Sequence, residues 1–187
     1  MRLFVAVDPG ERFRAQLATR LDVWREQLRI GWVEARNLHL TLRFLGELPA
    51  AAAQELAPAL RAAAAGRRAF TLQPGRLAAF PHLRDPRVLF LQMRGDGALE
   101  ELAAAVRLAT DPLLPPEQRD TKPFRAHLTL ARVKRPLSAA EARALAAMDA
   151  GAWDPLPVAD IRLVRSVLGS GGPVYTELMS VPLLPGG

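Results

Sequence analysis

The sequence contains no cysteine, and this absence removes several classes of protein at once. Disulfide bonds, thiolate metal sites such as zinc ribbons, and cysteine nucleophiles are all excluded. Lysine is scarce as well: Lys122 and Lys134 are the only two among 25 basic residues, so the positive charge is almost entirely arginine. Histidine occurs three times, at His39, His82 and His127.

Long apolar runs are also missing. No stretch approaches the ~18 apolar residues that a membrane-spanning helix needs. Residues 1–8 read as a strand, and they lack the charged region and long apolar core of a signal peptide. We therefore expect a cytoplasmic protein with no membrane association.

The composition is that of an ordinary globular protein. The 187 residues suit one domain, and 50% hydrophobic with 24% charged residues is far from the composition of disordered chains. The net charge of +6 suits an anionic partner such as nucleic acid. Because the arginines are spread along the chain, the charge alone identifies no binding surface.

Hydrophobic periodicity predicts a mixture of strands and helices. Strands are expected over residues 1–8, 37–44, 70–80, 87–94, 124–133, 158–168 and 174–183. Helices are expected over 13–28, 50–65, 99–113 and 138–148, with a turn at 81–86, a loop at 112–116 and a glycine-rich turn at 169–172. Since strands and helices do not alternate regularly, we predict an α+β fold with largely antiparallel sheets.

The second half of the chain repeats the arrangement of the first. The tetrapeptide His-Leu-Thr-Leu occurs at residues 39–42 and again 88 residues later, at 127–130. This spacing predicts a single domain over residues 1–187 with two pseudo-symmetric lobes, each contributing one such strand. The nearest thing to a boundary between the lobes is the segment 95–97, near the midpoint.

Strand geometry gives the repeated motif a chemical meaning. Alternate side chains share a face, so each His and the Thr two residues later project together, about 6–7 Å apart. Two imidazoles facing each other across a cleft suit in-line attack at phosphorus, where one accepts the nucleophile's proton and the other protonates the leaving oxygen. Threonine hydroxyls and an arginine can hold the non-bridging phosphoryl oxygens.

The residues alone allow two other interpretations of the motif. Each His could be an ordinary sheet histidine, as is usual for one copy of so short a motif, although two copies using two of three histidines favour function. Metal binding is the other alternative. It is disfavoured because neither tetrapeptide contains a carboxylate and no helix has a His-x-x-x-His pattern, so we expect no metal and no cofactor.

With its flanking residues, the repeated motif resembles the 2H phosphoesterase superfamily, and within it the bacterial and archaeal RNA 2′,3′-cyclic phosphodiesterases, also called 2′-5′ RNA ligases. The resemblance extends over nearly the whole chain, through residues 2–7, 32–33, 37–42, 44–47, 80–81, 86–89, 123–124, 127–132, 166 and 172–175. The stretch 110–120 fits no pattern of the family. In the segment before His127, Arg125-Ala126 stands where the family commonly has a proline.

The resemblance implies a bilobal fold in which two antiparallel sheets form a central cleft, with helices on the outside. It implies a metal-independent hydrolysis of a terminal RNA 2′,3′-cyclic phosphate to a 2′-phosphate. In this assignment His39 donates a proton to the departing 3′ oxygen and His127 is the base that activates water, an order that the sequence symmetry itself leaves open. Thr41 and Thr129 complete the catalytic set. The reverse reaction, with an RNA 5′-hydroxyl as nucleophile, would form a 2′-5′ linkage.

Four further residues are candidates for substrate binding. Arg43 shares strand parity with His39 and Thr41, so it is expected to reach the cleft unless it is solvated at the strand edge. Arg132 matches the family arginine after the second motif, but strict alternation places it opposite His127, so either a bulge or a strand that ends near Ala131 is required to turn it inward. Tyr175 and Phe80 are candidates for base stacking, with packing as the alternative. A solvent-exposed loop is expected for His82 and a core position for Trp32.

We expect RNA with a 2′,3′-cyclic phosphate end, tRNA fragments among them, as the partner, and a monomer with no obligate protein partner. Two other functions remain open. One is action on another cyclic phosphate or on a 2′-5′ oligonucleotide; the other is an RNA-end binding module without turnover. Histidines that are largely neutral at pH 7 disfavour the binding module, because arginine would bind phosphate better.

Overall fold

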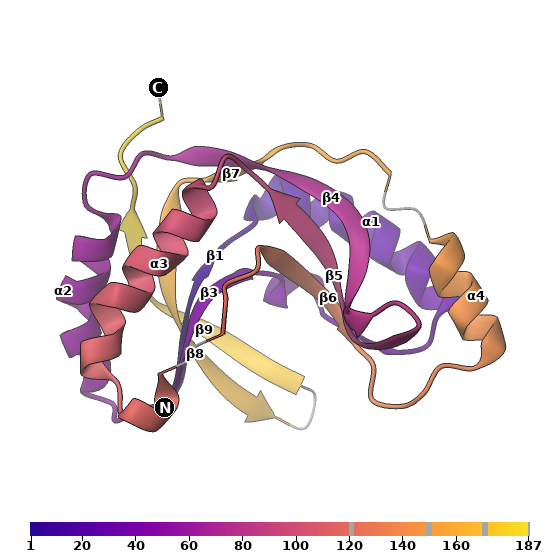
Figure 1. Ribbon diagram of the computed structural model, residues 1–187, viewed down its shortest axis with the longest axis horizontal. Helices are drawn as coiled ribbons and strands as arrows, with labels where there is room; N and C mark the ends of the chain where they lie inside the picture. The colour runs from indigo at the N-terminus through magenta and orange to yellow at the C-terminus, as the bar shows by residue number, and fades with distance from the viewer. Residues whose placement is uncertain (120–121, 149–150, 170–171, 187) are drawn as a thin grey trace.

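The computed structural model describes residues 1–119, 122–148, 151–169 and 172–186, which form two antiparallel sheets and their helices (Figure 1). The first sheet has the strand order β3-β1-β8-β9. Its strands are β1 (Arg2–Val7), β3 (Leu40–Glu47), β8 (Asp160–Gly169) and β9 (Gly172–Pro182). The second sheet has the order β2-β6-β5-β4-β7. Its strands are β2 (Gly31–Trp32), β4 (Phe70–His82), β5 (Asp85–Arg94), β6 (His127–Arg132) and β7 (Leu156–Val158).

The helices gather at the two ends of the molecule (Figure 1). They are α1 (Gly10–Gln27), α2 (Ala52–Ala64), α3 (Ala98–Thr110) and α4 (Ala139–Ala147). α2 and α3 pack against each other; α2 also contacts β8 and β9, and α3 contacts β3. α1 contacts β7, and its Trp24 stacks on Trp32 of β2, so α1 packs on the second sheet. The predicted α+β fold with antiparallel sheets is confirmed.

The two sheets do not correspond to the two halves of the chain. The last two strands, β8 and β9, extend the sheet that begins with β1, while β2, β4 and β5 from the first half flank β6. The segment 95–97, predicted to be a boundary, lies between β5 of the second sheet and α3, which packs on the first sheet. Each sheet therefore takes strands from both halves of the chain. One His-Leu-Thr-Leu motif lies at the start of β3, with His39 directly before the strand, and the other begins β6 in the second sheet.

A capping box sets the start of one helix, and several other boundaries differ from those expected from the sequence. α4 begins after Ser138, whose hydroxyl accepts the Glu141 N–H while the Glu141 carboxylate accepts the Ser138 N–H, a capping box. α1 ends earlier than its apolar pattern predicts, because Leu28 adopts an extended conformation and is still fully buried. The loop predicted at 112–116 contains parts of two short 3₁₀ turns, Asp111–Leu113 and Pro116–Gln118. The turn predicted at 81–86 shortens to two residues, and the one at 169–172 includes residues outside the described part of the chain.

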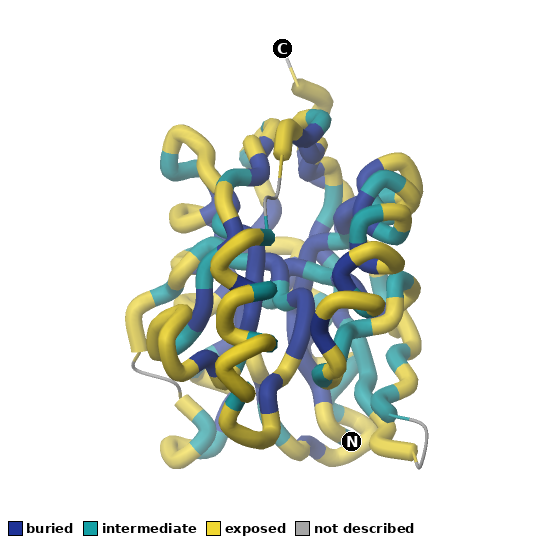
Figure 2. Tube along the Cα trace, turned by 90° about the vertical axis from the view of Figure 1, so that its right-hand side faces the viewer, coloured by how far each residue is buried: buried dark blue, intermediate teal, exposed yellow. Residues whose placement is uncertain are grey.

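Buried residues are concentrated along the central strands and on the helix faces turned toward them (Figure 2). The regular apolar positions of α1, namely Phe13, Leu17, Leu21 and Trp24, are all in this core. Burial of such a stripe is what stabilises an amphipathic helix of this length in a folded protein. None of the helices in the described residues has the length and apolar character needed to cross a membrane.

A glycine allows β2 to lie close beside β6. Gly31 pairs with Arg132, and a Cβ atom at position 31 would lie 2.9 Å from the carbonyl oxygen of Arg132. Such an approach is closer than van der Waals contact permits, so only glycine fits without a shift of the backbone. β2 thereby supports the end of β6 from which the Arg132 side chain projects.

Candidate active site

His39 and His127, which belong to the motifs of the two different sheets, are each oriented by an equivalent hydrogen bond. Nδ1 of His39 lies 2.7 Å from the carbonyl oxygen of Asn37, and Nδ1 of His127 lies 2.6 Å from the carbonyl oxygen of Arg125. A carbonyl oxygen only accepts, so each Nδ1 holds the proton and donates it. Nε2 is then the ring atom left for chemistry, as an acceptor in the neutral ring and as a donor in the protonated ring.

The carbonyl that orients His39 is itself fixed by the end of the first sheet. Asn37 closes a short 3₁₀ turn, Ala35–Asn37, directly before β3. Its side chain is buried, and its Nδ2 donates to the carbonyl oxygen of Pro173 in β9 at 2.9 Å. The C-terminal hairpin therefore locks the turn that holds the imidazole of His39.

Both imidazoles are biased toward the neutral form. Burial lowers the pKa of His39, and the charges of His127 and Arg132 act in the same direction, while the hydrogen bond to Asn37 and the carboxylate of Asp8 oppose them. Burial also lowers the pKa of His127, with Arg132 adding to the effect and the hydrogen bond to Arg125 opposing it. Each histidine is half-buried, so its ring still meets solvent. A neutral ring with Nδ1 protonated has the unprotonated Nε2 that a general base requires.

Each histidine lies against two aromatic rings from other strands of its own sheet. The ring centroid of His39 lies 4.7 Å from that of Phe4 and 5.2 Å from that of Tyr175. The ring centroid of His127 lies 5.3 Å from that of Phe80 and 5.4 Å from that of Phe90. Tyr175 and Phe80 were predicted to lie near the cleft, and the structure brings each to one histidine. Phe4 and Phe90 were missed, because both sit in apolar runs that read as buried strands.

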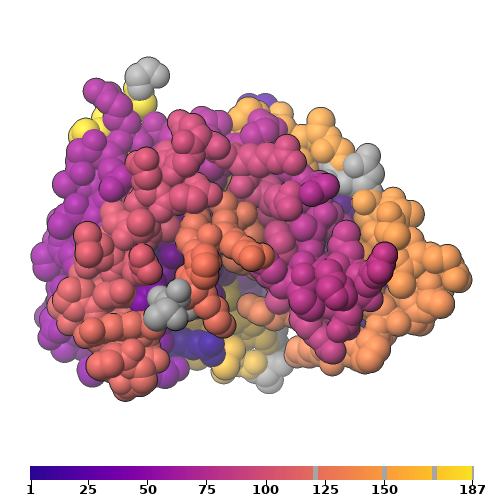
Figure 3. Space-filling view, in the orientation of Figure 1, coloured from indigo at the N-terminus to yellow at the C-terminus, as the bar shows by residue number. Residues whose placement is uncertain are grey.

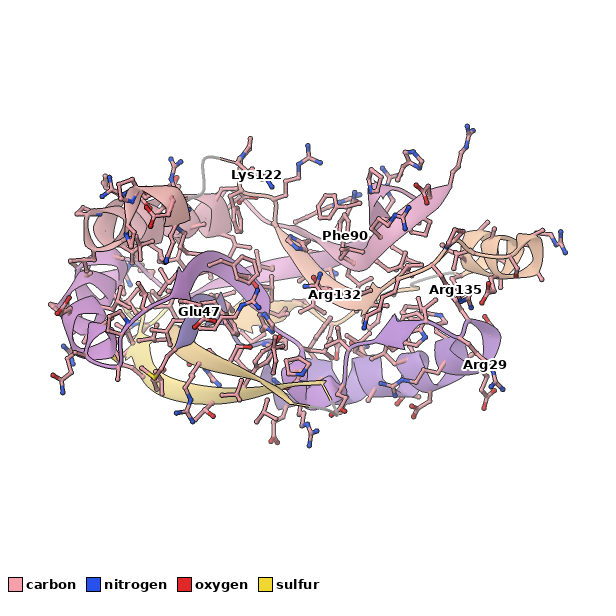
Figure 4. The ribbon with its side chains drawn as sticks, turned by 90° about the horizontal axis from the view of Figure 1, so that it is seen from below. Arg29, Glu47, Phe90, Lys122, Arg132 and Arg135 are labelled. Carbon is pink, nitrogen blue, oxygen red and sulfur yellow. The ribbon has the colours of Figure 1, made fainter. Side chains whose placement is uncertain are left out.

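A β-bulge turns Arg132 to the same face as His127 and Thr129. In the pairing of β5 with β6, Phe90 faces Thr129 and Leu89 faces Ala131, so Leu130 is the extra residue. Val88 and Phe90 share a face of β5, and their partners Arg132 and Thr129 therefore share a face of β6. Figure 4 shows Arg132 near the middle of the molecule, whereas Arg29 and Arg135 lie at its periphery. Of the two alternatives expected from the sequence, the bulge is the one present.

The same bulge occurs in β3 and overturns the expected alternation there. Ala6 faces Thr41 and Val5 faces Arg43, so Leu42 is the extra residue. By this register Arg43 does not share a strand face with Thr41. It is only 5% exposed and pairs with Asp111, which follows α3, yet it lines the same cavity as Thr41 and His127. Phe44 takes the face of Thr41 and is 53% exposed.

The structure also shows the exposure and contacts of the remaining residues singled out in the sequence. Thr41 and Thr129 are half-buried on the faces described above. His82 is exposed, as expected, and its Nδ1 accepts the N–H of Asp85 in the β4–β5 turn. Trp32 packs against Trp24 and the core, which confirms its predicted structural role.

Two cavities adjoin the histidines. The larger, about 440 Å³, extends from Thr41 and His127 to α3 and the segment 122–125, and Figure 3 shows the surface hollowed beside that segment. The smaller, about 160 Å³, adjoins His39 and Tyr175 and contains the ion-paired side chains of Asp8, Arg162 and Glu177. Within the described residues, no group of three or more His, Asp or Glu side chains gathers that could hold a metal ion.

Comparison with known proteins identifies this arrangement. A sequence profile described as the 2′-5′ RNA ligase superfamily matches residues 13–168. The chain belongs to the 2′-5′ RNA ligase superfamily. Among its relatives, the RNA 2′,3′-cyclic phosphodiesterase of Archaeoglobus fulgidus is 32% identical over 95% of this chain and 98% of its own length. The enzyme of the same name from Thermus thermophilus is 38% identical over 95% of this chain and 88% of its own length.

Solved structures of superfamily members match the fold over almost the whole chain. The crystal structure of TT0787 from Thermus thermophilus has a TM-score of 0.83 at 34% identity and covers 98% of both chains. Escherichia coli LigT in complex with 3′-AMP has a TM-score of 0.75 at 29% identity and covers 97% of both chains. The family resemblance drawn from the two motifs is confirmed, together with the 2H phosphoesterase-like fold that it implies.

Proposed function

We propose that this protein opens the terminal 2′,3′-cyclic phosphate of RNA to a 2′-phosphate by acid–base catalysis at His39 and His127. The observation that supports it best is the matched pair of imidazoles, each with Nδ1 donating to a carbonyl two residues upstream and Nε2 left for chemistry. The relatives from Archaeoglobus fulgidus and Thermus thermophilus are named for this reaction. Without a second group, one histidine would supply only half of the proton transfers that the displacement needs.

In the proposed reaction, Nε2 of neutral His127 removes a proton from water as the water oxygen bonds to phosphorus. The bond from phosphorus to the 3′ oxygen breaks, and protonated His39 gives its Nε2 proton to that oxygen. Arg132, Thr41 and Thr129 hold the non-bridging oxygens, where negative charge grows in the transition state. Of the two arginine candidates, Arg132 fits this role better, because Arg43 is already paired with Asp111.

The order of the two roles follows the family resemblance, and Asp8 supports it. Its carboxylate favours the protonated form of His39, whereas the pKa of His127 is shifted by burial, Arg132 and the hydrogen bond to Arg125. The dianion-like transition state would add to this effect once substrate is bound. Asp8 thus partly offsets the burial that lowers the pKa of His39, and the family resemblance remains the basis for assigning His39 as the acid.

A binding module without turnover is a poorer fit to the same geometry. Burial favours neutral imidazoles at both positions, and a neutral ring binds a phosphate weakly. Run in reverse, the proposed chemistry joins the cyclic end to an RNA 5′-hydroxyl through a 2′-5′ bond, so ligation is proposed as a second activity. We further propose a cytoplasmic monomer that needs no metal, cofactor or protein partner.

The test uses 2′,3′-cyclic AMP and an RNA oligonucleotide with a 2′,3′-cyclic end, both in the presence of EDTA. We expect hydrolysis of both to 2′-phosphates alone. Adding an acceptor strand with a 5′-hydroxyl tests ligation in the same mixture. A 3′-phosphate product, or a loss of turnover that added divalent metal restores, would contradict the proposal.

A further inference from the structure

The larger cavity continues well beyond the residues that surround the reacting phosphate. From Thr41 and His127 it runs between β3, the face of α3 and the segment 122–125, with a volume of about 440 Å³. Two alanines of α3, Ala103 and Ala104, keep this wall low. We call this extension the basic groove, lined by Phe44, Glu100, Arg107, Lys122, Pro123 and Arg125.

The charge of the basic groove is positive. Among the described residues that line it, Arg107 on α3 and the pair Lys122 and Arg125 before β6 are cationic, and Glu100 contributes one carboxylate. Arg43 and Asp111 at its inner end neutralise each other. Two features thus combine in one channel: cations from two different elements, and an exposed aromatic ring at Phe44. This combination is what binds single-stranded nucleic acid, with cations along the backbone and rings for the bases.

The smaller cavity beside His39 does not compete for the same ligand. At about 160 Å³ it has less than half the volume, and Asp8 and Glu177 project into it. Both carboxylates are held by Arg162, at 3.2 Å and 3.1 Å. A chain of phosphodiesters would meet paired charges there, whereas the basic groove offers it a net positive surface.

We propose that the basic groove binds the single-stranded RNA immediately upstream of the cyclic phosphate. The inference rests on the proposed function, since it assumes that the cyclic end lies at the two histidines. Arg107 and Lys122 contact backbone phosphates of this strand, and the ring of Phe44 offers a stacking surface to a base. The protein therefore prefers the end of an RNA strand over a cyclic mononucleotide.

The experiment compares two substrates, 2′,3′-cyclic AMP and a single-stranded RNA pentamer with a 2′,3′-cyclic end. For each variant we measure kcat/KM on both and take the ratio of pentamer to mononucleotide. Arg107→Ala and Lys122→Ala should each lower this ratio by about 3- to 10-fold at low salt, and each should reduce the slope of log kcat/KM against log salt by about 0.7. Arg125 is left intact, because its carbonyl orients His127.

Two further variants test whether the change in the ratio depends on the charge of the basic groove. Arg143→Ala removes an exposed arginine from α4, at the opposite end of the molecule from α3, and should leave the ratio unchanged (Figure 1). Glu100→Gln removes the carboxylate of the basic groove and should raise the ratio. An equal loss on both substrates, or a loss with Arg143→Ala as large as with Arg107→Ala, would overturn the inference.

A failure of the proposed function gives a different result. If the wild-type protein hydrolyses neither substrate, the proposed function is wrong, and fluorescence anisotropy with the labelled pentamer then tests the basic groove alone. Weaker pentamer binding by Arg107→Ala and Lys122→Ala, with Arg143→Ala unaffected, would still support the groove. Equal binding by all of these variants would refute it.

Discussion

Thr129 and Arg132 point to the same face of β6 although an odd number of positions separates them, because Leu130 is bulged. The equivalent bulge at Leu42 brings Thr41 and Phe44 to one face of β3. Arg132 and Phe44 each stand five residues after the histidine of their motif. The two motifs are therefore alike in backbone structure as well as in sequence, since each is followed by a bulge. They differ in the side chain five residues after the histidine, which is an arginine in β6 and a phenylalanine in β3.

The position of Arg132 makes it the residue whose loss should most affect catalysis after the histidines. Its charge reaches both imidazoles and Tyr175. Arg132→Ala should lower kcat for 2′,3′-cyclic AMP by about 10²- to 10³-fold, the usual effect of removing a group that stabilises transition-state charge. Arg132→Lys should recover only part of this loss, since an ammonium lacks the guanidinium fork.

Arg29→Ala is the matched control for this substitution, because Arg29 is an exposed arginine at the periphery (Figure 4). It should retain the wild-type kcat. Steady-state kinetics on the three variants, together with circular dichroism to confirm folding, decides the point. A folded Arg132→Ala protein with wild-type kcat would show that Arg132 does not take part in catalysis.

Bulges explain why the sequence predicted some site residues and misplaced others. Strand alternation correctly predicted that His127 and Thr129 share a face of β6, because no bulge falls between them. His39 lies directly before β3, one residue outside its paired register. The bulged leucine that follows each threonine has the same sequence signature as an ordinary core residue of a strand. Alternation alone therefore could not show that the residues after it change to the other face of the strand. The equal spacing from His39 to Phe44 and from His127 to Arg132 was the available signal.

Long-range contacts also lay beyond what local sequence patterns predict. The helices were recognisable from local apolar spacing, but the pairing of β8 with β1 depends on segments more than 150 residues apart. Asp111 lies in a stretch that fits no family pattern, so nothing indicated that its carboxylate would bind the buried Arg43. Similarly, Phe4 and Phe90 gave no sign in the sequence that their rings would meet the two histidines.

Substitution of the histidines tests the acid–base pair directly, and the third histidine provides its control. His39→Ala and His127→Ala should each lower kcat by at least about 10²-fold, since each removes one proton-transfer group. His82→Ala should have no effect, because that ring is exposed in the β4–β5 turn. Stopped assays with product separation on 2′,3′-cyclic AMP give the rates. Wild-type turnover by either alanine variant would remove that residue from the mechanism.

The Arg43–Asp111 pair should contribute to stability and not to phosphate binding. Removing Arg43 leaves the Asp111 carboxylate, which is 31% exposed, without its buried partner. We expect Arg43→Met to lower the free energy of unfolding in urea by about 1–3 kcal/mol, less than for a fully buried pair because solvent reaches Asp111.

A double variant separates the ion pair from other effects of the substitution. Arg43→Met combined with Asp111→Asn should cost less than the sum of the two single changes, because each single change already breaks the pair. Additive losses of stability would show that the two side chains act independently. An Arg43→Met protein of unchanged stability with a large rise in KM would restore the original expectation that Arg43 binds substrate.

Asp8 offers a test of which histidine is the acid. Its carboxylate raises the pKa of His39, against the larger effect of burial, which lowers it. Asp8→Asn should therefore lower the pKa of His39 further. If His39 must be protonated to react, activity is lost as pH rises through its pKa, so the alkaline limb of kcat/KM should move to lower pH. The acid limb, set by deprotonation of His127, should stay in place, because Asp8 is absent from the influences on that ring.

Asp160→Asn is the control for this experiment, because Asp160 also pairs with Arg162 but does not influence either histidine. Its pH profile should match that of the wild type. The pH dependence of kcat/KM for 2′,3′-cyclic AMP, measured at constant ionic strength for all three proteins, gives both limbs. The reversed assignment, with His39 as base, predicts the opposite pattern: Asp8→Asn would then shift the acid limb to lower pH and leave the alkaline limb unchanged.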